Sequence, residues 1–125
     1  MTRPRPRCIV VVRVYEDPGR EPGDHRVLVD RLWPRGVARA VLDHDQWAKE
    51  LTPSTELRRW YGHSPDRFEE FSRRYRDELD SHEARTAIGG LVDISPPGRL
   101  VLLTATRDVE HSGAVVLKSV LDETT

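Results

Sequence analysis

The stretch "RVLVDRLWPRG" (residues 26–36) changes character halfway along its length. Its first part, residues 26–30, holds three consecutive aliphatic side chains, as in a strand that is covered on both faces of a sheet. The six positions from residue 30 to residue 35 contain four side chains that could bind a ligand: Asp30, Arg31, Trp33 and Arg35. Ligands of open α/β sheets bind beyond the carboxyl ends of the strands. The stretch therefore predicts a buried strand that leads directly into a binding site.

Two other segments have the composition of strands. Residues 8–15 ("CIVVVRVY") and 98–106 ("GRLVLLTAT") are rich in β-branched and aliphatic residues and are predicted to be strands. Residues 16–25 hold two prolines and two glycines, which indicates a loop. Residues 1–7 ("MTRPRPR") are expected to form a flexible basic arm.

Four segments are predicted to be helices: residues 54–62, a longer helix that begins at Ser64 and Pro65, residues 83–92, and residues 108–123. Thr52 or Ser54 can cap the first helix, and Gly62 can end it. The longer helix has one apolar stripe, because its large side chains are spaced three, four and four residues apart: Phe68, Phe71, Tyr75 and Leu79. Asp108 can cap the last helix.

The order of these segments is strand, strand, helices, strand and helix. This order predicts an α/β fold, with a small, mostly parallel sheet flanked by helices in a single compact domain over residues 8–122. A chain of 125 residues is long enough for one such core.

The composition limits the classes of protein. Charged residues make up 33% of the chain, but the net charge is −1, which argues against a protein that binds nucleic acid through bulk charge. Cys8 is the single cysteine, so a disulfide within the chain and a multi-cysteine zinc site are excluded. The chain has no long apolar run, and we expect a cytoplasmic protein without a membrane partner.

The residues after the second strand suit a comb of cationic and aromatic side chains. Pro34 restricts Trp33 to an extended backbone. If the chain stays extended here, Arg31, Trp33 and Arg35 project to one side, because side chains alternate along a strand. Two guanidinium groups would then flank an indole and could bind a planar or anionic ligand. The alternative is structural, with Asp30 and Arg31 paired with neighbours and Trp33 covering the core.

The third strand also ends in polar residues, "TATRDVEH" (104–111). Thr104 is a candidate ligand-binding residue here, and the first amides of the following helix can bind an anion. Asp108 and His111 are three residues apart, can share a helix face and form a candidate catalytic pair. The alternative is that Asp108 is an ordinary cap and His111 a surface residue.

His63, Lys49 and Arg74 complete the candidate residues. His63 directly follows Gly62 and could act as an acid, a base or a metal ligand, or could instead bond the last carbonyls of the helix. Lys49 could add positive charge to a ligand site. Arg74 lies on an arginine-rich helix, whose acidic residues would equally suit a solvated face.

Four stretches together resemble the YeaO-like branch of the domain-of-unknown-function 488 family: "RVLVDRLWPRG" (26–36), "WAKELTPSTELRRWYGH" (47–63), "FSRRYRDEL" (71–79) and "LVLLTATRDVEHSGAVVLK" (100–118). The resemblance covers about residues 8–122 and implies a compact α/β domain, but it implies no reaction. The characteristic polar positions of the family fall on Asp30, Arg31, Trp33, Arg35, Lys49, Pro53, Ser54, His63, Arg74, Asp108 and His111. Members often have Asn after the last histidine, where this chain has Ser112.

These residues suit three functions, given in order of preference. The first is an enzyme or binding protein for an anionic or planar small molecule, in which Arg31 and Arg35 hold the anion, Trp33 stacks, and His63 or His111 moves a proton. The second is a protein that holds a metal or a non-covalent haem through His63 or His111. The third is an adaptor for nucleic acid or protein, favoured by the basic arm and the arginine-rich helix. The sequence leaves the reaction, the cofactor and the oligomeric state open.

Overall fold

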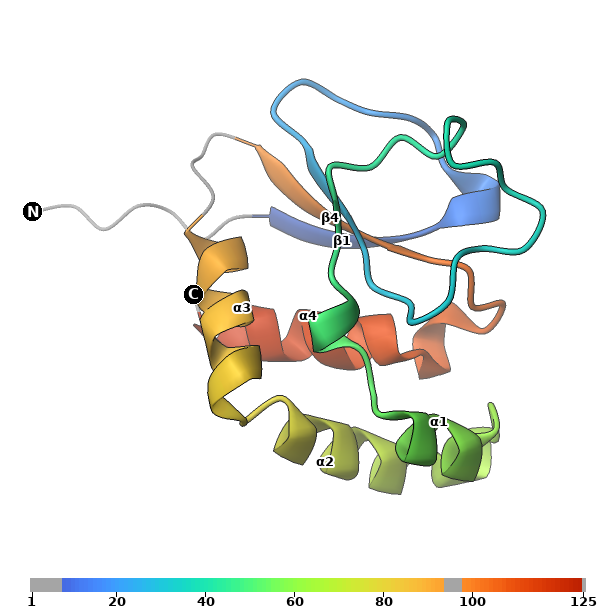
Figure 1. Cartoon of the computed structure of the whole chain (residues 1–125), viewed down its shortest axis with the longest axis vertical. Helices are drawn as coiled ribbons and strands as arrows, with labels where there is room; N and C mark the ends of the chain where they lie inside the picture. Colours follow the sequence, from blue (N-terminus) through green and yellow to red (C-terminus); the bar gives the residue numbers. More distant parts are fainter. Residues whose placement is uncertain (1–7, 94–97, 125) are drawn as a thin grey trace, which may run out of the picture.

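The sheet consists of parallel strands in the order β1-β4-β2-β3 (Figure 1). The computed structural model describes residues 8–93 and 98–124, so the expected basic arm lies outside the described residues. The strands are β1 (Cys8–Arg13), β2 (His25–Leu28), β3 (Gln46–Trp47) and β4 (Arg99–Thr104). The predicted α/β fold with a mostly parallel sheet is therefore confirmed.

Sequence analysis missed β3, the shortest strand. It pairs only Gln46 with Val27 and Trp47 with Leu28, and two residues are too few to show the alternation that marks a strand. The predicted strands are otherwise found, with shorter bounds. The backbone of Val29 continues the ladder beyond β2, because its amide donates to the carbonyl of Leu103 at 3.0 Å.

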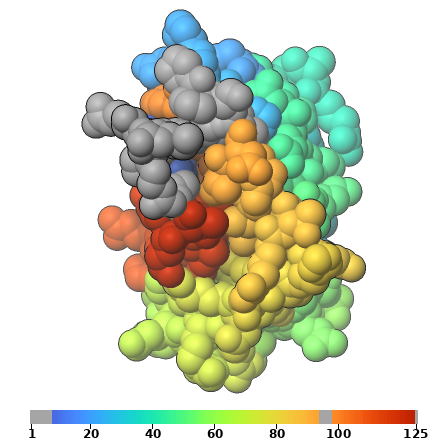
Figure 2. Space-filling view, turned by 90° about the vertical axis from the view of Figure 1, so that its left-hand side faces the viewer, coloured from blue at the N-terminus to red at the C-terminus, as the bar shows by residue number. Residues whose placement is uncertain are grey.

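All the labelled helices lie on one side of the sheet (Figure 1). They are α1 (Thr55–Tyr61), α2 (Phe68–Glu78), α3 (His82–Val92) and α4 (Gly113–Thr124). The predicted stripe of the longer helix faces this layer, with Phe71, Tyr75 and Leu79 buried and Phe68 partly buried. Figure 2 shows α3 and the C-terminal part of α4 side by side at the surface, where the two helices contact each other. The main core lies between this layer and the sheet.

The helix ends match the sequence in one case and differ in another. The Oγ atom of Ser54 accepts from the Leu57 amide at 3.1 Å, and Gly62 ends α1 in the left-handed conformation with a φ of 52°. The predicted start at Asp108 is wrong, because α4 begins at Gly113 and residues 109–111 form a separate 3-10 turn. A Cβ atom at Gly113 would lie 3.4 Å from the Tyr75 ring, an ordinary van der Waals distance, so the start of α4 packs directly against α2.

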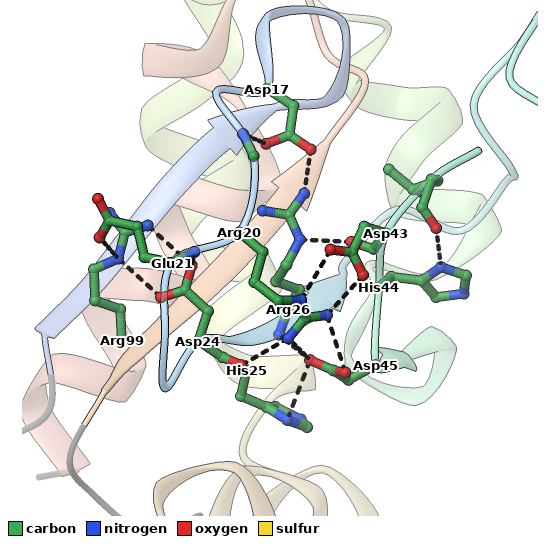
Figure 3. Close-up of polar contacts among 12 residues, drawn as sticks. Asp17, Arg20, Glu21, Asp24, His25, Arg26, Asp43, His44, Asp45 and Arg99 are labelled. Atoms are coloured by element: carbon green, nitrogen blue, oxygen red, sulfur yellow. Dashed lines mark hydrogen bonds and ion pairs between the residues drawn. The ribbon is translucent and has the colours of Figure 1, made fainter. Parts of the chain in front are cut away.

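The opposite face of the sheet is covered by two loops, residues 14–24 and 29–45, which an arginine network joins (Figure 3). Arg26 is only 1% exposed, and its guanidinium contacts the Asp17 carboxylate and donates to the Asp43 carbonyl at 2.5 Å. Arg20 bridges the carboxylates of Asp43 and Asp45, at 2.8 and 3.1 Å. A buried arginine thus joins the two loops, which also pack apolar side chains such as Leu42 against the sheet.

This network predicts acid-sensitive stability. Hydrogen bonds from Arg99 to Asp24 and from Arg20 to Asp43 hold the pKa of each carboxyl below its ordinary value. Their contribution to the free energy of unfolding is therefore complete above the unfolded pKa of about 3.9 and is lost as the pH falls through the folded values. We expect the urea midpoint to fall as the pH is lowered from about 4 to about 2, and to fall less in Arg99→Gln.

The matched control is Arg85→Gln, since Arg85 contacts Asp80 in an exposed pair on the helical side of the molecule. It should keep the pH dependence of the wild type. An Arg99→Gln variant with an unchanged pH dependence would show that the network does not carry the acid sensitivity.

Phe71→Ala tests the main core. The Phe71 side chain is 2% exposed, and its ring stacks on that of Tyr61 with centroids 4.2 Å apart. We expect a loss of about 3–5 kcal/mol in the free energy of unfolding, because a large cavity replaces a fully buried ring. Chemical denaturation measures this loss, and a value below about 1 kcal/mol would place the ring outside the core.

Candidate functional site

The carboxylate of Asp30 joins the carboxyl ends of β2 and β4. Its Oδ1 atom accepts from the Thr104 hydroxyl at 2.7 Å, and its Oδ2 atom accepts from the Ala105 amide at 2.7 Å. The backbone carbonyl of Asp30 accepts from the Trp47 indole at 2.7 Å. The two polar strand ends therefore meet at one edge of the sheet, as the sequence predicted.

A cavity of about 640 Å³ opens at this edge. It lies between the chain after β2, helix α1 and the start of α4. Buried side chains, including Val29, Tyr61 and Phe71, form its apolar part. Its polar lining includes Asp30, Arg31, Arg35, Arg58, Arg59, His63, Thr106 and Ser112.

The lining contains four arginines and one carboxylate, that of Asp30. Arg31 reaches the Thr52 hydroxyl at 3.4 Å, a long hydrogen bond. The guanidinium groups of Arg35, Arg58 and Arg59 make no hydrogen bond or ion pair with the described residues. The cavity is therefore strongly cationic, although the whole chain has a net charge of −1.

Asp30 has an unusual environment for an aspartate. It makes no ion pair with any described residue, although it shares the cavity with the four arginines. Burial raises the pKa of its carboxyl, and this effect outweighs the hydrogen bonds from Ala105 and Thr104 and the charges of Arg58 and His63, which lower it. Thr104 is fully buried against this carboxylate, so it positions Asp30.

The chain after the second strand is not extended throughout, although Arg31, Trp33 and Arg35 all line the cavity. The chain bends at Arg31 and turns again at Arg35, because no neighbouring strand holds it extended beyond the end of β2. Trp33 lines the cavity but is also held in the loop layer, where its indole donates to the Val37 carbonyl at 2.6 Å. Its ring makes an edge contact with that of Trp47, with centroids 5.4 Å apart. Stacking of a ligand on Trp33 stays a prediction.

The candidate proton-transfer residues lie in two places. His63 lines the cavity and has a φ of 56°, in the left-handed region that few non-glycine residues adopt. His111 lies outside the lining, and its Nδ1 atom is 2.7 Å from the Asp108 carboxylate. Tyr61 connects the two places, because it lines the cavity and its hydroxyl donates to the His111 carbonyl at 2.6 Å. Burial raises the pKa of this hydroxyl, which keeps it protonated as a donor.

Lys49 and Arg74 do not line the cavity. The ammonium of Lys49 lies 4.0 Å from the centre of the Trp47 ring. Arg74 donates to the Glu70 carboxylate at 2.7 Å and covers the Trp60 ring. Sequence analysis missed Arg58 and Arg59, which lie on α1 inside the stretch "ELRRWYGH" (56–63). Their position on the helix that leads to His63, five and four residues before it, was the available signal.

Among residues 8–93 and 98–124, no group of three or more His, Cys, Asp or Glu side chains could hold a metal ion. Within the same part of the chain, no helix has the length and apolar character needed to cross a membrane.

Fold and site together define an α/β domain with an arginine-lined cavity at the carboxyl edge of its sheet. The profile of one protein family, described as the inactive DUF488-N3 subclade, matches residues 8–125. The chain belongs to the DUF488 family, within this subclade.

Several relatives are uncharacterised proteins. The chain is 44% identical over 114 residues to proteins of Mycobacterium bovis and Mycobacterium tuberculosis, which covers 90% of this chain and 92% of each relative. It is 40% identical over 105 residues to the protein YeaO of Escherichia coli, which covers 84% of this chain and 89% of YeaO. No solved structure matches the chain.

The role of Asp30 in holding the site together is testable by two substitutions. Asp30→Ala should lower the free energy of unfolding by about 1–3 kcal/mol, because the buried Thr104 hydroxyl and the Ala105 amide lose their acceptor. Asp30→Asn should cost less, since its amide oxygen keeps one acceptor. Urea denaturation measures both losses. An Asp30→Ala variant as stable as the wild type would show that the two hydrogen bonds of Asp30 are not needed for stability.

Proposed function

We propose that this protein binds a small anionic molecule in the arginine-lined cavity and does not transform it. The observation that carries the proposal is that Arg35, Arg58 and Arg59 share one cavity without a carboxylate partner among the described residues. Like charges brought together without counter-charges repel one another, so the arrangement favours a bound anion. Arginine suits this task, because its planar fork binds carboxylate and phosphate groups through two parallel hydrogen bonds.

The arginines elsewhere in the structure support this interpretation, because most of them contact a carboxylate. Arg73 and Arg74 share Glu70, and Arg76 contacts Glu123 at 2.6 Å. The other arginines in contact with Asp or Glu are Arg13, Arg20, Arg26, Arg85 and Arg99. Arg39, Arg67 and Arg107 also lack a carboxylate partner among the described residues, but they do not line the cavity, whereas Arg35, Arg58 and Arg59 share it.

The start of α4 adds to the positive potential of the cavity. Ser112, Gly113 and Ala114 line the cavity, and α4 begins at Gly113. The first amides of a helix have no partner within the helix, and the helix dipole favours negative charge near them. An anion held by the arginines would therefore also gain from this helix.

The family description favours binding over turnover. The matching subclade is described as inactive, and the sequence offers no nucleophile with an adjacent base. Proton transfer by His63, or by the Asp108–His111 pair, stays a prediction. The paired arginines of α2 give less support to an adaptor for nucleic acid, since Glu70 and Glu123 already neutralise them.

Haem binding also stays a prediction, and one residue supports it. His63 lines the cavity and could provide an axial ligand, with the arginines near the propionates, whereas His111 lies outside the lining. An absorption band at roughly 400 nm in the purified protein would support haem binding.

Titration with inorganic phosphate tests the proposed anion site. We expect binding by the wild type that weakens as salt is added, because charge provides most of the attraction. Arg58→Gln should weaken binding by at least roughly 1.5 kcal/mol, the value of a lost charge-assisted hydrogen bond. Isothermal titration calorimetry measures both.

Arg85→Gln is the matched control, because Arg85 is exposed, outside the cavity lining and in contact with Asp80. It should bind phosphate as the wild type does. The proposal fails if the wild type binds no phosphate, or if both substitutions weaken binding equally.

A further inference from the structure

We propose that the bound molecule is a purine nucleotide whose base carries two adjacent N–H donors, as guanine does, with its phosphate on the arginines and its base edge on Asp30. This inference rests on the proposed anion site and names its ligand class. The positive charges of the cavity lie on its arginines, and its one negative charge lies on Asp30.

The one carboxylate of the cavity lining makes no direct ion pair, although the charges of Arg58 and His63 act on it. Asp30 lines the same cavity as Arg31, Arg35, Arg58 and Arg59, but it forms no ion pair with them. A buried carboxylate without a cationic partner is costly, and the chain offers several arginines nearby that could have relieved this cost. A ligand with an anionic end and a donor end would satisfy both parts of the site.

The hydrogen bonds of Asp30 leave room for such a donor end. A carboxylate has about four lone-pair positions, and the described residues use one on each oxygen of Asp30, through Thr104 and Ala105. One position on each oxygen therefore remains for a ligand. Two adjacent N–H groups match two carboxylate oxygens, in the same way as the fork of an arginine does.

Thr104 and Ala105 also fix the carboxylate in place. Their bonds hold both oxygens at 2.7 Å, so Asp30 loses little conformational freedom when it accepts from a ligand. A preorganised carboxylate can discriminate between ligands, because a base without the second donor leaves one acceptor unsatisfied.

The size and the walls of the cavity suit a nucleotide better than a simple ion. Its volume of about 640 Å³ lies in the range of sites for drug-sized ligands, and inorganic phosphate would leave most of it unfilled. Apolar and aromatic side chains, including Tyr15, Tyr61 and Phe71, line part of it. Such surface suits a flat ring, because burial of apolar area drives binding.

Calorimetric titration with three probes tests the inference: inorganic phosphate, guanosine 5′-monophosphate and inosine 5′-monophosphate, which lacks the second donor. We expect the wild type to bind the guanosine compound at least about tenfold more tightly than the inosine compound, the effect of one hydrogen bond to a charged group. In Asp30→Asn the preference between the two nucleotides should fall below about threefold, because the amide presents a donor to the base.

Each outcome separates this inference from the proposed function. Phosphate binding without a preference for guanosine would overturn the ligand class and leave the anion site intact. An Asp30→Asn variant that keeps the preference would overturn the role of Asp30, whereas no binding of any probe by the wild type would overturn both proposals. The comparison of the two nucleotides on the wild type needs no variant, so it stands even if Asp30→Asn does not fold.

Discussion

The carboxylate of Asp30 is the contact on which the rest of the site depends. It ties the end of β2 to the Thr104 hydroxyl and the Ala105 amide at the end of β4. This contact fixes where the chain leaves the sheet, and it thereby places Arg31 and Arg35 beside α1. The same contact sets the direction in which β4 leads toward the start of α4. The cavity lies between these segments, where they leave the two strand ends that Asp30 joins.

The two faces of the sheet are covered by layers that differ in their interactions. The helices cover one face of the sheet with an apolar core, in the ordinary manner of an α/β protein. The loops on the other face bury a smaller apolar cluster around Leu28 and Leu103, together with the arginine network of Arg20 and Arg26 (Figure 3). Ion pairs thus join the loops on this face, whereas the arginines that line the cavity have no carboxylate partner among the described residues. The gathering of unpaired arginines in one cavity is the observation that supports the proposed anion site.

Much of the fold could be predicted from the sequence, because it depends on local patterns. Runs of β-branched residues marked β1 and β4, and the spacing from Phe68 to Leu79 marked the buried face of α2. The start of α4 was not predictable in this way. It is set where α4 packs against α2, which is a tertiary contact. The two residues of β3 are too few to form a pattern.

The site was predicted in part for the same reason. Polar residues after β2 and β4 indicated the correct edge of the sheet, because parallel strands share their carboxyl edge. Arg58 and Arg59 were missed, since only the packing of α1 brings them to that edge. Lys49 and Arg74 looked equally suitable in sequence but face Trp47 and Trp60. Membership of the DUF488 family agrees with the fold and leaves the ligand to be identified by experiment.

A crystal structure of the protein grown in phosphate tests the central claim most directly. The account predicts an anion in the cavity within hydrogen-bond distance of at least one of Arg35, Arg58 and Arg59, with Asp30 still bonded to Thr104 and Ala105. An empty cavity whose arginines form ion pairs with Asp30 or with another carboxylate of the chain would contradict it.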